Sequence, residues 1–361
     1  MLDNEPDFRR VIAALEHEEP DRVPLVEAAV DYEIMGRFLG HPVVDSDIAA
    51  QVNFWKAAGY DYVPLTVGMM SPGGVTKDSQ ISKTIQNVVL RDAPERENAN
   101  AWNLEQRSFI HTERDLEDFP WAEAARLDTS KFYQIAPLLP PGMKVVALSG
   151  KIFTLSWMLM GFENFAINSV TNQAFVQRLV EKVARIQLAG LREVAGLPYV
   201  AAAWAVDDLC FGSGPILRPT VLRKTIFPWY EEFGAICRSH GLHFLFHTDG
   251  VVWDLIDDLL GLGIRALHPI DPTCMDIDEV KLRVGQRLCI MGNISNELLQ
   301  NGTPKEVAEL TKRRLHTLGP GGGYCLGSGN SVPAWARLDN YRAMLAADFA
   351  YGRYPLPAAL C

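Results

Sequence analysis

The chain has 361 residues, of which 48% are hydrophobic and 22% are charged, and its formal net charge at pH 7 is −10. This composition excludes a disordered protein, because such chains lack the apolar residues that offset the entropy of unfolding. The negative charge argues against a protein that binds nucleic acid or an anionic membrane surface, since both need a basic face.

Apolar runs, the N-terminal stretch and the cysteines together predict that the protein is cytoplasmic. No apolar run reaches about 18 residues, so we expect no membrane span. The charged N-terminal stretch predicts an amphipathic helix and not a signal peptide. The six cysteines are scattered without CxxC pairs, which is typical of reduced thiols in a cytoplasmic protein.

Short apolar runs alternate along the chain with helical stretches. Strands that alternate with helices pair in parallel, and eight such strands predict a (β/α)8 TIM barrel. The eight runs are Arg22–Ala29, Tyr60–Val67, Lys144–Gly150, Tyr199–Asp208, His243–Gly250, Ile264–Asp271, Leu288–Ser295 and Gly323–Asn330.

Two of the intervening stretches carry clear helical signals. Apolar residues between Val176 and Ile186 fall at helical spacing, which predicts a helix with one buried stripe. Thr303, Pro304 and Glu306 form the pattern of a helix start, with a cap, a first-turn proline and a capping-box glutamate.

Residues 71–121 interrupt this rhythm between the second and third strands. The segment contains two alternating pieces, Ile81–Leu90 and Trp102–Ile110, which predict a β-hairpin insertion. No linker divides the chain. We therefore expect residues 1–361 to form a single barrel domain with one excursion.

In a barrel of this kind the chemistry lies at the carboxyl ends of the strands. The most specific element there is His247-Thr248-Asp249. Residues two apart on a strand face the same side, so both side chains should point into the barrel mouth. Three interpretations stay open: a general acid/base pair, two metal ligands, or a structural histidine beside a helix cap.

Further candidates lie at the ends of other strands. Glu27 follows an apolar run and is a candidate third metal ligand or substrate contact. Asp207 is a catalytic candidate, although one of Asp207 and Asp208 is expected to cap the next helix. The remaining substrate-binding candidates are the aromatic residues Phe153, Trp204 and Phe211, and Asn330 in a glycine-rich stretch at the mouth.

At these residues the sequence resembles the uroporphyrinogen decarboxylase superfamily. The likeness is strongest between Asp207 and Tyr341, in the motifs DDLCFGSGPILRP, PWY, FHTDG, ALHPID, MGNIS, NGTPKEV, GPGGGYCLGSGNSVP and DNYRAML. The resemblance implies a barrel fold and one of two activities. These are decarboxylation of porphyrinogen acetate groups, and methyl transfer to or from a corrinoid carried on a separate protein.

The chain departs from both patterns. The decarboxylases carry an Arg-rich segment after the first strand, whereas residues 26–40 here are acidic and apolar up to Arg37. The thiol methyltransferases hold zinc with a His-x-Cys pair and a distant Cys. His247 matches that histidine, but Asp249 replaces the first Cys, and Cys325 lies three or four residues before the expected position of the second.

The resemblance therefore favours the branch that demethylates methoxylated substrates. We predict a methyltransferase that moves a methyl group from a small methoxylated compound, aromatic ones included, to a corrinoid protein, with a zinc ion held by His247, Asp249 and Glu27. The alternatives are a decarboxylase that uses Lys151 or Arg218 as carboxylate partners, and a corrinoid- or tetrapyrrole-binding protein without catalytic activity.

Overall fold

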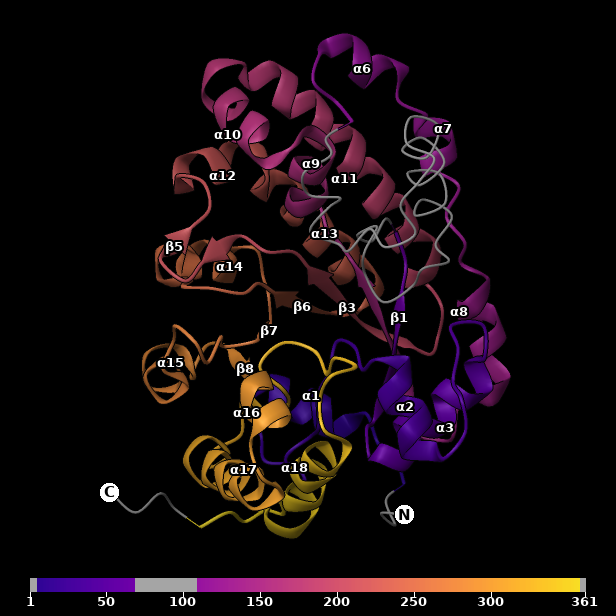
Figure 1. Ribbon diagram of the computed structural model, residues 1–361, viewed down its shortest axis with the longest axis vertical. Coiled ribbons are helices and arrows are strands. Elements are labelled where there is room, and N and C mark those ends of the chain that lie inside the picture. The colour runs from indigo at the N-terminus through magenta and orange to yellow at the C-terminus, as the bar shows by residue number, and fades with distance from the viewer. Residues whose placement is uncertain (1–4, 69–108, 358–361) are drawn as a thin grey trace.

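A curved parallel sheet lies at the centre of the protein, with helices around it (Figure 1). The computed structural model describes residues 5–68 and 109–357. Within these residues the sheet has seven strands in the order β1-β2-β3-β6-β7-β8-β9, and each neighbouring pair is parallel. The strands are β1 Tyr62–Thr66, β2 Lys144–Ser149, β3 Val200–Val206, β6 His243–His247, β7 Ala266–His268, β8 Cys289–Met291 and β9 Tyr324–Cys325. The predicted α/β architecture is confirmed for these seven runs.

The first predicted strand, residues 22–29, needs a correction. This segment makes isolated parallel bridges, Leu25 with Leu326 and Val30 with Val332, instead of a continuous ladder. Val26 donates its backbone N–H to the carbonyl of Leu326 at 2.8 Å. The segment therefore lies beside β9, at the position of an eighth strand, without being one.

Prolines explain why no ladder joins this segment to β1. Pro24 lacks an N–H to donate. Val67 donates its N–H to the carbonyl of Leu148 in β2, and backbone N–H groups alternate between the two sides of a strand. The nitrogen of Pro64, three residues earlier, therefore faces the first segment, and it has no hydrogen to donate. The N–H of Glu27 instead donates to the hydroxyl of Tyr62 at 2.9 Å. A side-chain contact thus replaces the strand pairing.

Helices follow the strands and cover the outer face of the sheet. The predicted buried stripe is confirmed in α11, and the predicted capping box of Thr303 and Glu306 is confirmed at the start of α17. The helices are α1 Arg9–Leu15, α2 Tyr32–Leu39, α3 Ile48–Ala58, α6 Glu113–Asp118, α7 Trp121–Ala124, α8 Ser130–Ile135, α9 Phe153–Met160, α10 Phe162–Thr171, α11 Gln173–Ala195, α12 Pro219–Thr225, α13 Phe227–His240, α14 Ile256–Gly261, α15 Ile277–Val284, α16 Asn296–Asn301, α17 Pro304–Leu318 and α18 Leu338–Tyr351, with two short 3-10 turns, η1 Ala136–Leu138 and η2 Trp253–Leu255.

The strands divide the apolar core into two layers. One set of alternate residues, including Trp204 and Leu245, fills the inside of the curved sheet together with Tyr62. The other set, including Ala203 and Phe246, packs against the surrounding helices. This alternation fixes which side chains at the strand ends point inward.

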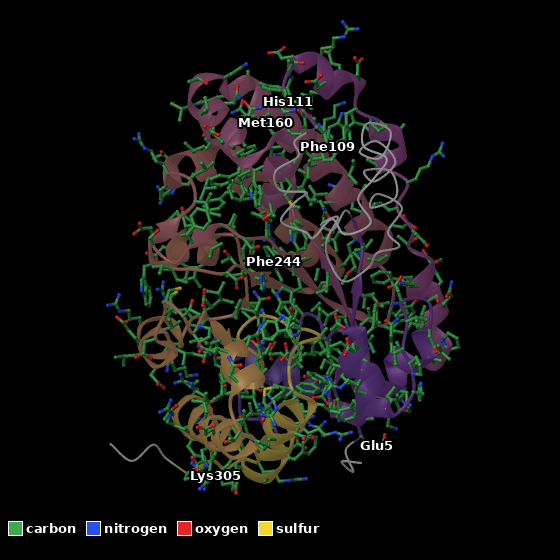
Figure 2. All side chains as sticks on the ribbon, in the orientation of Figure 1. Glu5, Phe109, His111, Met160, Phe244 and Lys305 are labelled. Atoms are coloured by element: carbon green, nitrogen blue, oxygen red, sulfur yellow. The ribbon has the colours of Figure 1, made fainter. Side chains whose placement is uncertain are left out.

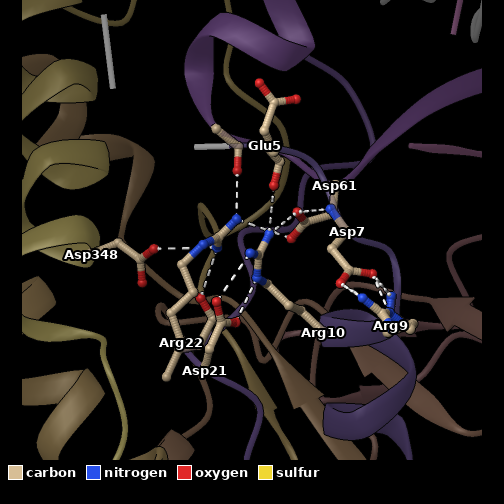
Figure 3. A network of polar contacts seen from close by, with 10 residues as sticks. Glu5, Asp7, Arg9, Arg10, Asp21, Arg22, Asp61 and Asp348 are labelled. Carbon is tan, nitrogen blue, oxygen red and sulfur yellow. Dashed lines mark hydrogen bonds and ion pairs between the residues drawn. The ribbon is translucent and has the colours of Figure 1, made fainter. Parts of the chain in front are cut away.

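A network of ion pairs lies at the amino end of the sheet (Figure 3). Arg22 and Arg10 both contact the buried carboxylate of Asp61, at 3.0 and 2.8 Å. Arg10 also contacts Asp21 at 2.6 Å, and Arg22 lies 3.7 Å from Asp348 of α18. The network ties α1, the first segment, the start of β1 and α18 together.

The predicted β-hairpin of residues 71–121 falls mostly outside the described residues. Phe109 and Ile110 are described and are not part of a strand, since both donate their N–H groups to the carbonyl of Leu159. Phe109, His111 and Met160 accordingly lie together at one end of the molecule, far from Lys305 (Figure 2). From Glu113 onward the chain is helical.

Among the described residues, no helix combines the length and the apolar character that crossing a bilayer requires.

Candidate active site

Three neighbouring strands bring polar side chains together at the carboxyl end of the sheet. The strand register pairs Val206 of β3 with His247 of β6, and His247 with His268 of β7. The pairing continues past the strands, because Asp207 donates its N–H to the carbonyl of His247, and Thr248 donates to that of His268. Asp208 and Asp249 each lie two residues beyond the last residue of β3 and β6.

His247 lies between two carboxylates and a second imidazole. Its Nε2 atom is 3.6 Å from Oδ1 of Asp208 and 3.9 Å from Oδ1 of Asp249. Its Nδ1 atom is 2.8 Å from Nδ1 of His268. Each carboxylate is therefore beyond hydrogen-bond distance of the ring, whereas the two imidazoles are bonded.

Burial and neighbouring charges shift the pKa values of His247, Asp208 and Asp249 away from their ordinary values. Burial disfavours the imidazolium of His247, but the carboxylates of Asp208 and Asp249 outweigh it, and the pKa of His247 is raised. Burial also opposes ionisation of Asp208, yet contact with His247 and the charge of Lys151 lower its pKa to about 2. For Asp249 burial prevails, with help from the charges of Asp208 and Asp271, and raises its pKa to about 6.

The same three residues have the arrangement of a metal site. Within residues 5–68 and 109–357, one ligand atom from each of Asp208, His247 and Asp249 lies within 4.8 Å of the others. Ligands about 2.0–2.2 Å from a tetrahedral zinc ion lie about 3.4 Å apart, close to the distances seen here. Oδ1 of Asp249 is buried and has no hydrogen-bond partner among the described residues. The donor set fits a zinc ion with one open position.

Asn330 and Gly250 hold Asp249 in place. The side-chain amide of Asn330 donates to Oδ2 of Asp249 at 2.6 Å, so this predicted substrate contact orients a carboxylate. Gly250 has φ +86°, and a Cβ atom there would lie 2.5 Å from the carbonyl oxygen of Phe211. The backbone after Asp249 thus presses on a small hairpin formed by β4 (Cys210–Phe211) and β5 (Gly214–Pro215).

Asp207, predicted as catalytic, faces away from this group. Its buried carboxylate accepts hydrogen bonds from the N–H groups of Phe153 and Thr154 and from the hydroxyl of Tyr230. Burial raises the pKa of Asp207, although these donors oppose the shift. Asp207 therefore anchors the start of α9.

Glu27 is also separate from the group of three. Its carboxyl is fully buried and accepts hydrogen bonds from the N–H and the hydroxyl of Ser328, at 2.6 and 2.7 Å. Burial raises the pKa of Glu27 to about 8 despite these donors. The group of potential metal ligands that the structure brings together among the described residues contains Asp208 and does not contain the predicted Glu27.

The predicted aromatic residues lie in three different surroundings. Phe153 is fully buried among the helices, edge-on to Phe165. Trp204 is fully buried inside the sheet, with its ring edge-on to His268 at 5.0 Å. Phe211 is 52% exposed and contacts Phe162 at the rim.

Sequence reasoning missed Asp208 and His268 as site residues. The signal was present in the period-two pattern of the strands. Trp204 and Val206 point into the barrel, so the next inward position is Asp208 and not Asp207. By the same alternation, the inward Ala266 predicts an inward His268.

Comparison with known proteins identifies the family. A family model described as uroporphyrinogen decarboxylase (URO-D) matches residues 127–348, which is more than half of the chain. The chain belongs to this family. The matched residues include the whole group of Asp208, His247 and Asp249.

A solved structure resembles nearly the whole of this chain. A methyltransferase from Methanosarcina mazei matches with a TM-score of 0.67 and 16% identity, over 96% of this chain and 99% of that one. At this identity the match shows a shared fold. No curated protein matches the chain significantly.

Proposed function

We propose that this protein is a metal-dependent methyltransferase that moves a methyl group from a small methoxylated compound, aromatic ethers included, to the cobalt of a corrinoid protein. The observation that carries the proposal is the group of Asp208, His247 and Asp249 at the carboxyl end of the sheet. Family membership and the fold shared with a methyltransferase support it.

Demethylation of an ether needs help at the leaving oxygen. Co(I) attacks the methyl carbon, the C–O bond breaks, its electron pair stays on oxygen, and the cobalt becomes Co(III)–CH3. The new alkoxide or phenolate needs a positive charge or a proton. A zinc ion bound by Asp208, His247 and Asp249 would supply Lewis-acid stabilisation of that oxygen.

The protein's own residues add to this chemistry. The pKa of Asp249 is raised to about 6 in the metal-free site, but as a zinc ligand Asp249 is an unprotonated carboxylate, so its role is to hold the cation beside the oxygen. Lys151, which follows β2, contributes a positive charge that acts on all three members of the group. The positive charge of Lys151 stabilises negative charge that develops on the substrate.

Decarboxylation is the alternative, because the matching family model carries that description. A substrate carboxylate would face the carboxylates of Asp208 and Asp249, with Lys151 as the nearby counter-charge. Arg218, the other candidate, is exposed at the N-cap of α12. Like charges at the mouth disfavour a polycarboxylate substrate.

The first experiment measures methyl transfer directly. Protein is incubated with reduced cob(I)alamin and a panel of methyl ethers, and methylcobalamin is followed by absorbance. We expect methylcobalamin with wild type and a loss of at least about 100-fold in His247→Ala. His243→Ala, at the opposite end of the same strand, is the matched control and should keep the activity.

Two other outcomes would contradict the proposal. Release of carbon dioxide from a small acid, with no dependence on cobalamin, would favour the decarboxylase. Tight corrinoid binding without turnover, unchanged in His247→Ala, would favour a binding protein.

Elemental analysis tests the metal separately. We expect about one zinc ion per chain in wild type and its loss in His247→Ala and Asp208→Ala. Glu27→Gln should keep the zinc, since Glu27 bonds to Ser328. Loss of zinc in Glu27→Gln, but not in Asp208→Ala, would restore the ligand set that the sequence suggested.

A further inference from the structure

His268 is a buried imidazole with one polar partner. It is fully buried on β7, and its Nδ1 atom is bonded to Nδ1 of His247. Its Nε2 atom is also buried and has no hydrogen-bond partner among the described residues. Trp204 packs edge-on against its ring and limits the ring's rotation. A buried histidine in this position needs an explanation beyond packing.

When both rings are neutral, the bond between the two Nδ1 atoms carries a single proton, which leaves two arrangements. If His268 donates, His247 must carry its own proton on Nε2, toward Asp208 and Asp249. If His247 donates, its Nε2 atom presents a lone pair to the space between the two carboxylates. Each arrangement leaves one Nε2–H without a hydrogen bond, that of His247 in the first and that of His268 in the second, so the positions of the carboxylates around His247 decide between them.

The distances favour the second arrangement. An Nε2–H group on His247 would have acceptors only at 3.6 and 3.9 Å, too far for a hydrogen bond. The same distances suit three ligands that converge on one cation. A lone pair on Nε2 is the form that binds a metal ion.

We infer that His268 is a positioning residue, which accepts the Nδ1 proton of His247 and thereby directs the Nε2 lone pair of His247 toward the cation. This inference rests on the metal site of the proposed function. A hydrogen bond to the second ring nitrogen of a ligating histidine fixes its tautomer and its orientation. Here an imidazole takes the role that carboxylates or backbone carbonyls fill in most metal sites.

Two substitutions of similar volume separate positioning from packing. His268→Leu removes the acceptor, and His268→Asn keeps an acceptor oxygen near the position of Nδ1. We expect zinc affinity, measured by competition with a chromophoric chelator, to fall 10- to 100-fold in His268→Leu. His268→Asn should keep most of the affinity, and His243→Leu serves as the control on the neighbouring strand.

A spectroscopic measurement on wild type avoids the risk of misfolding. Long-range 1H–15N spectra of histidine-labelled, metal-free protein at pH 9 report which ring nitrogen carries the proton. We expect the proton of His247 on Nδ1 and that of His268 on Nε2. A proton on Nε2 of His247, or equal zinc affinity in His268→Leu and His268→Asn, would overturn the inference.

The two failures can be told apart. If wild type binds no zinc, the proposed metal site fails, and the tautomer spectrum still tests His268. If wild type binds zinc, His247→Ala loses it and His268→Leu does not, the metal site stands and the role of His268 fails.

Discussion

At the amino end of the sheet, the buried carboxylates of Asp61 and Asp348 face arginines, whereas at the carboxyl end two carboxylates face one imidazole. Arg22 contacts both Asp61 and Asp348, and Arg10 adds a second cation to Asp61. Asp208 and Asp249 instead flank His247. At the amino end each of these carboxylates has an arginine in contact, whereas at the carboxyl end the ion pairs of Asp208 and Asp249 among the described residues are with His247 and not with a lysine or arginine.

This difference indicates that the amino end of the sheet serves stability, whereas the carboxyl end serves binding. Removing one member of a buried, paired network leaves an uncompensated charge and destabilises the fold. Groups that repel one another at a site cost stability until a ligand supplies the missing charge. The comparison predicts opposite effects for substitutions at the two ends.

The largest expected effect is at the amino end. Arg22→Met leaves the buried carboxylate of Asp348 without its cation and the carbonyl of Gly59 without its donor. We expect a loss of about 4 kcal/mol in the free energy of unfolding, measured by urea denaturation. Arg114→Met breaks an exposed i,i+4 pair with Asp118 and should cost about 0.5 kcal/mol or less. Equal losses in both variants would remove the distinction between buried and exposed pairs.

A second effect concerns Glu27, a buried carboxyl held by Ser328. Its pKa of about 8 lies above the ordinary value, so the folded state holds its proton more tightly than the unfolded state. Stability on this account falls as pH rises from about 4.5 to about 8. Glu27→Gln should remove that decline, on the order of 3–5 kcal/mol across the window. Melting temperatures of both proteins between pH 4 and 9 test this, and parallel curves would contradict it.

The smallest effect is at the carboxyl end and has the opposite sign from Arg22→Met. Asp249 has a raised pKa, so the metal-free fold loses stability as pH rises from about 4 to about 6. Asp249→Asn cannot ionise and keeps an acceptor for Asn330. Because the side chain is 35% exposed, we expect a gain of only about 1 kcal/mol at pH 7 in chelator-treated protein.

Zinc should reverse the order of these two proteins. Added zinc stabilises wild type by about 2.7 kcal/mol at 100 times its dissociation constant, and Asp249→Asn should gain much less. A metal-free Asp249→Asn variant less stable than wild type would contradict the view that this end is strained by like charges.

Much of the fold could be predicted from the sequence because it depends on local patterns. The alternating apolar runs give seven strands, and Thr303 and Glu306 mark a helix start where the structure has one. The first run failed because Pro24 and Pro64 remove hydrogen-bond donors on facing segments, and their pairing is visible only in three dimensions.

The site was predicted less completely for the same reason. His247 and Asp249 are close in sequence, and the structure brings them together. His247 and His268 are 21 residues apart in the sequence, and their contact depends on the register between β6 and β7. Strict use of strand alternation would have favoured Asp208 over Asp207, and it would have placed Glu27 on the side opposite to Val26 and Ala28, which fill the inside of the sheet.

Gly250 links the rim of the barrel mechanically to its chemistry. Gly250, the residue next to Asp249, lies so close to the backbone of Phe211 that no side chain fits there, and the N–H of Val251 donates to the carbonyl of Phe211 on the β4–β5 hairpin. A molecule that displaces this hairpin when it enters the mouth must also shift the carboxylate. Binding of a substrate at the mouth and binding of a cation by Asp249 would then be coupled through this backbone contact.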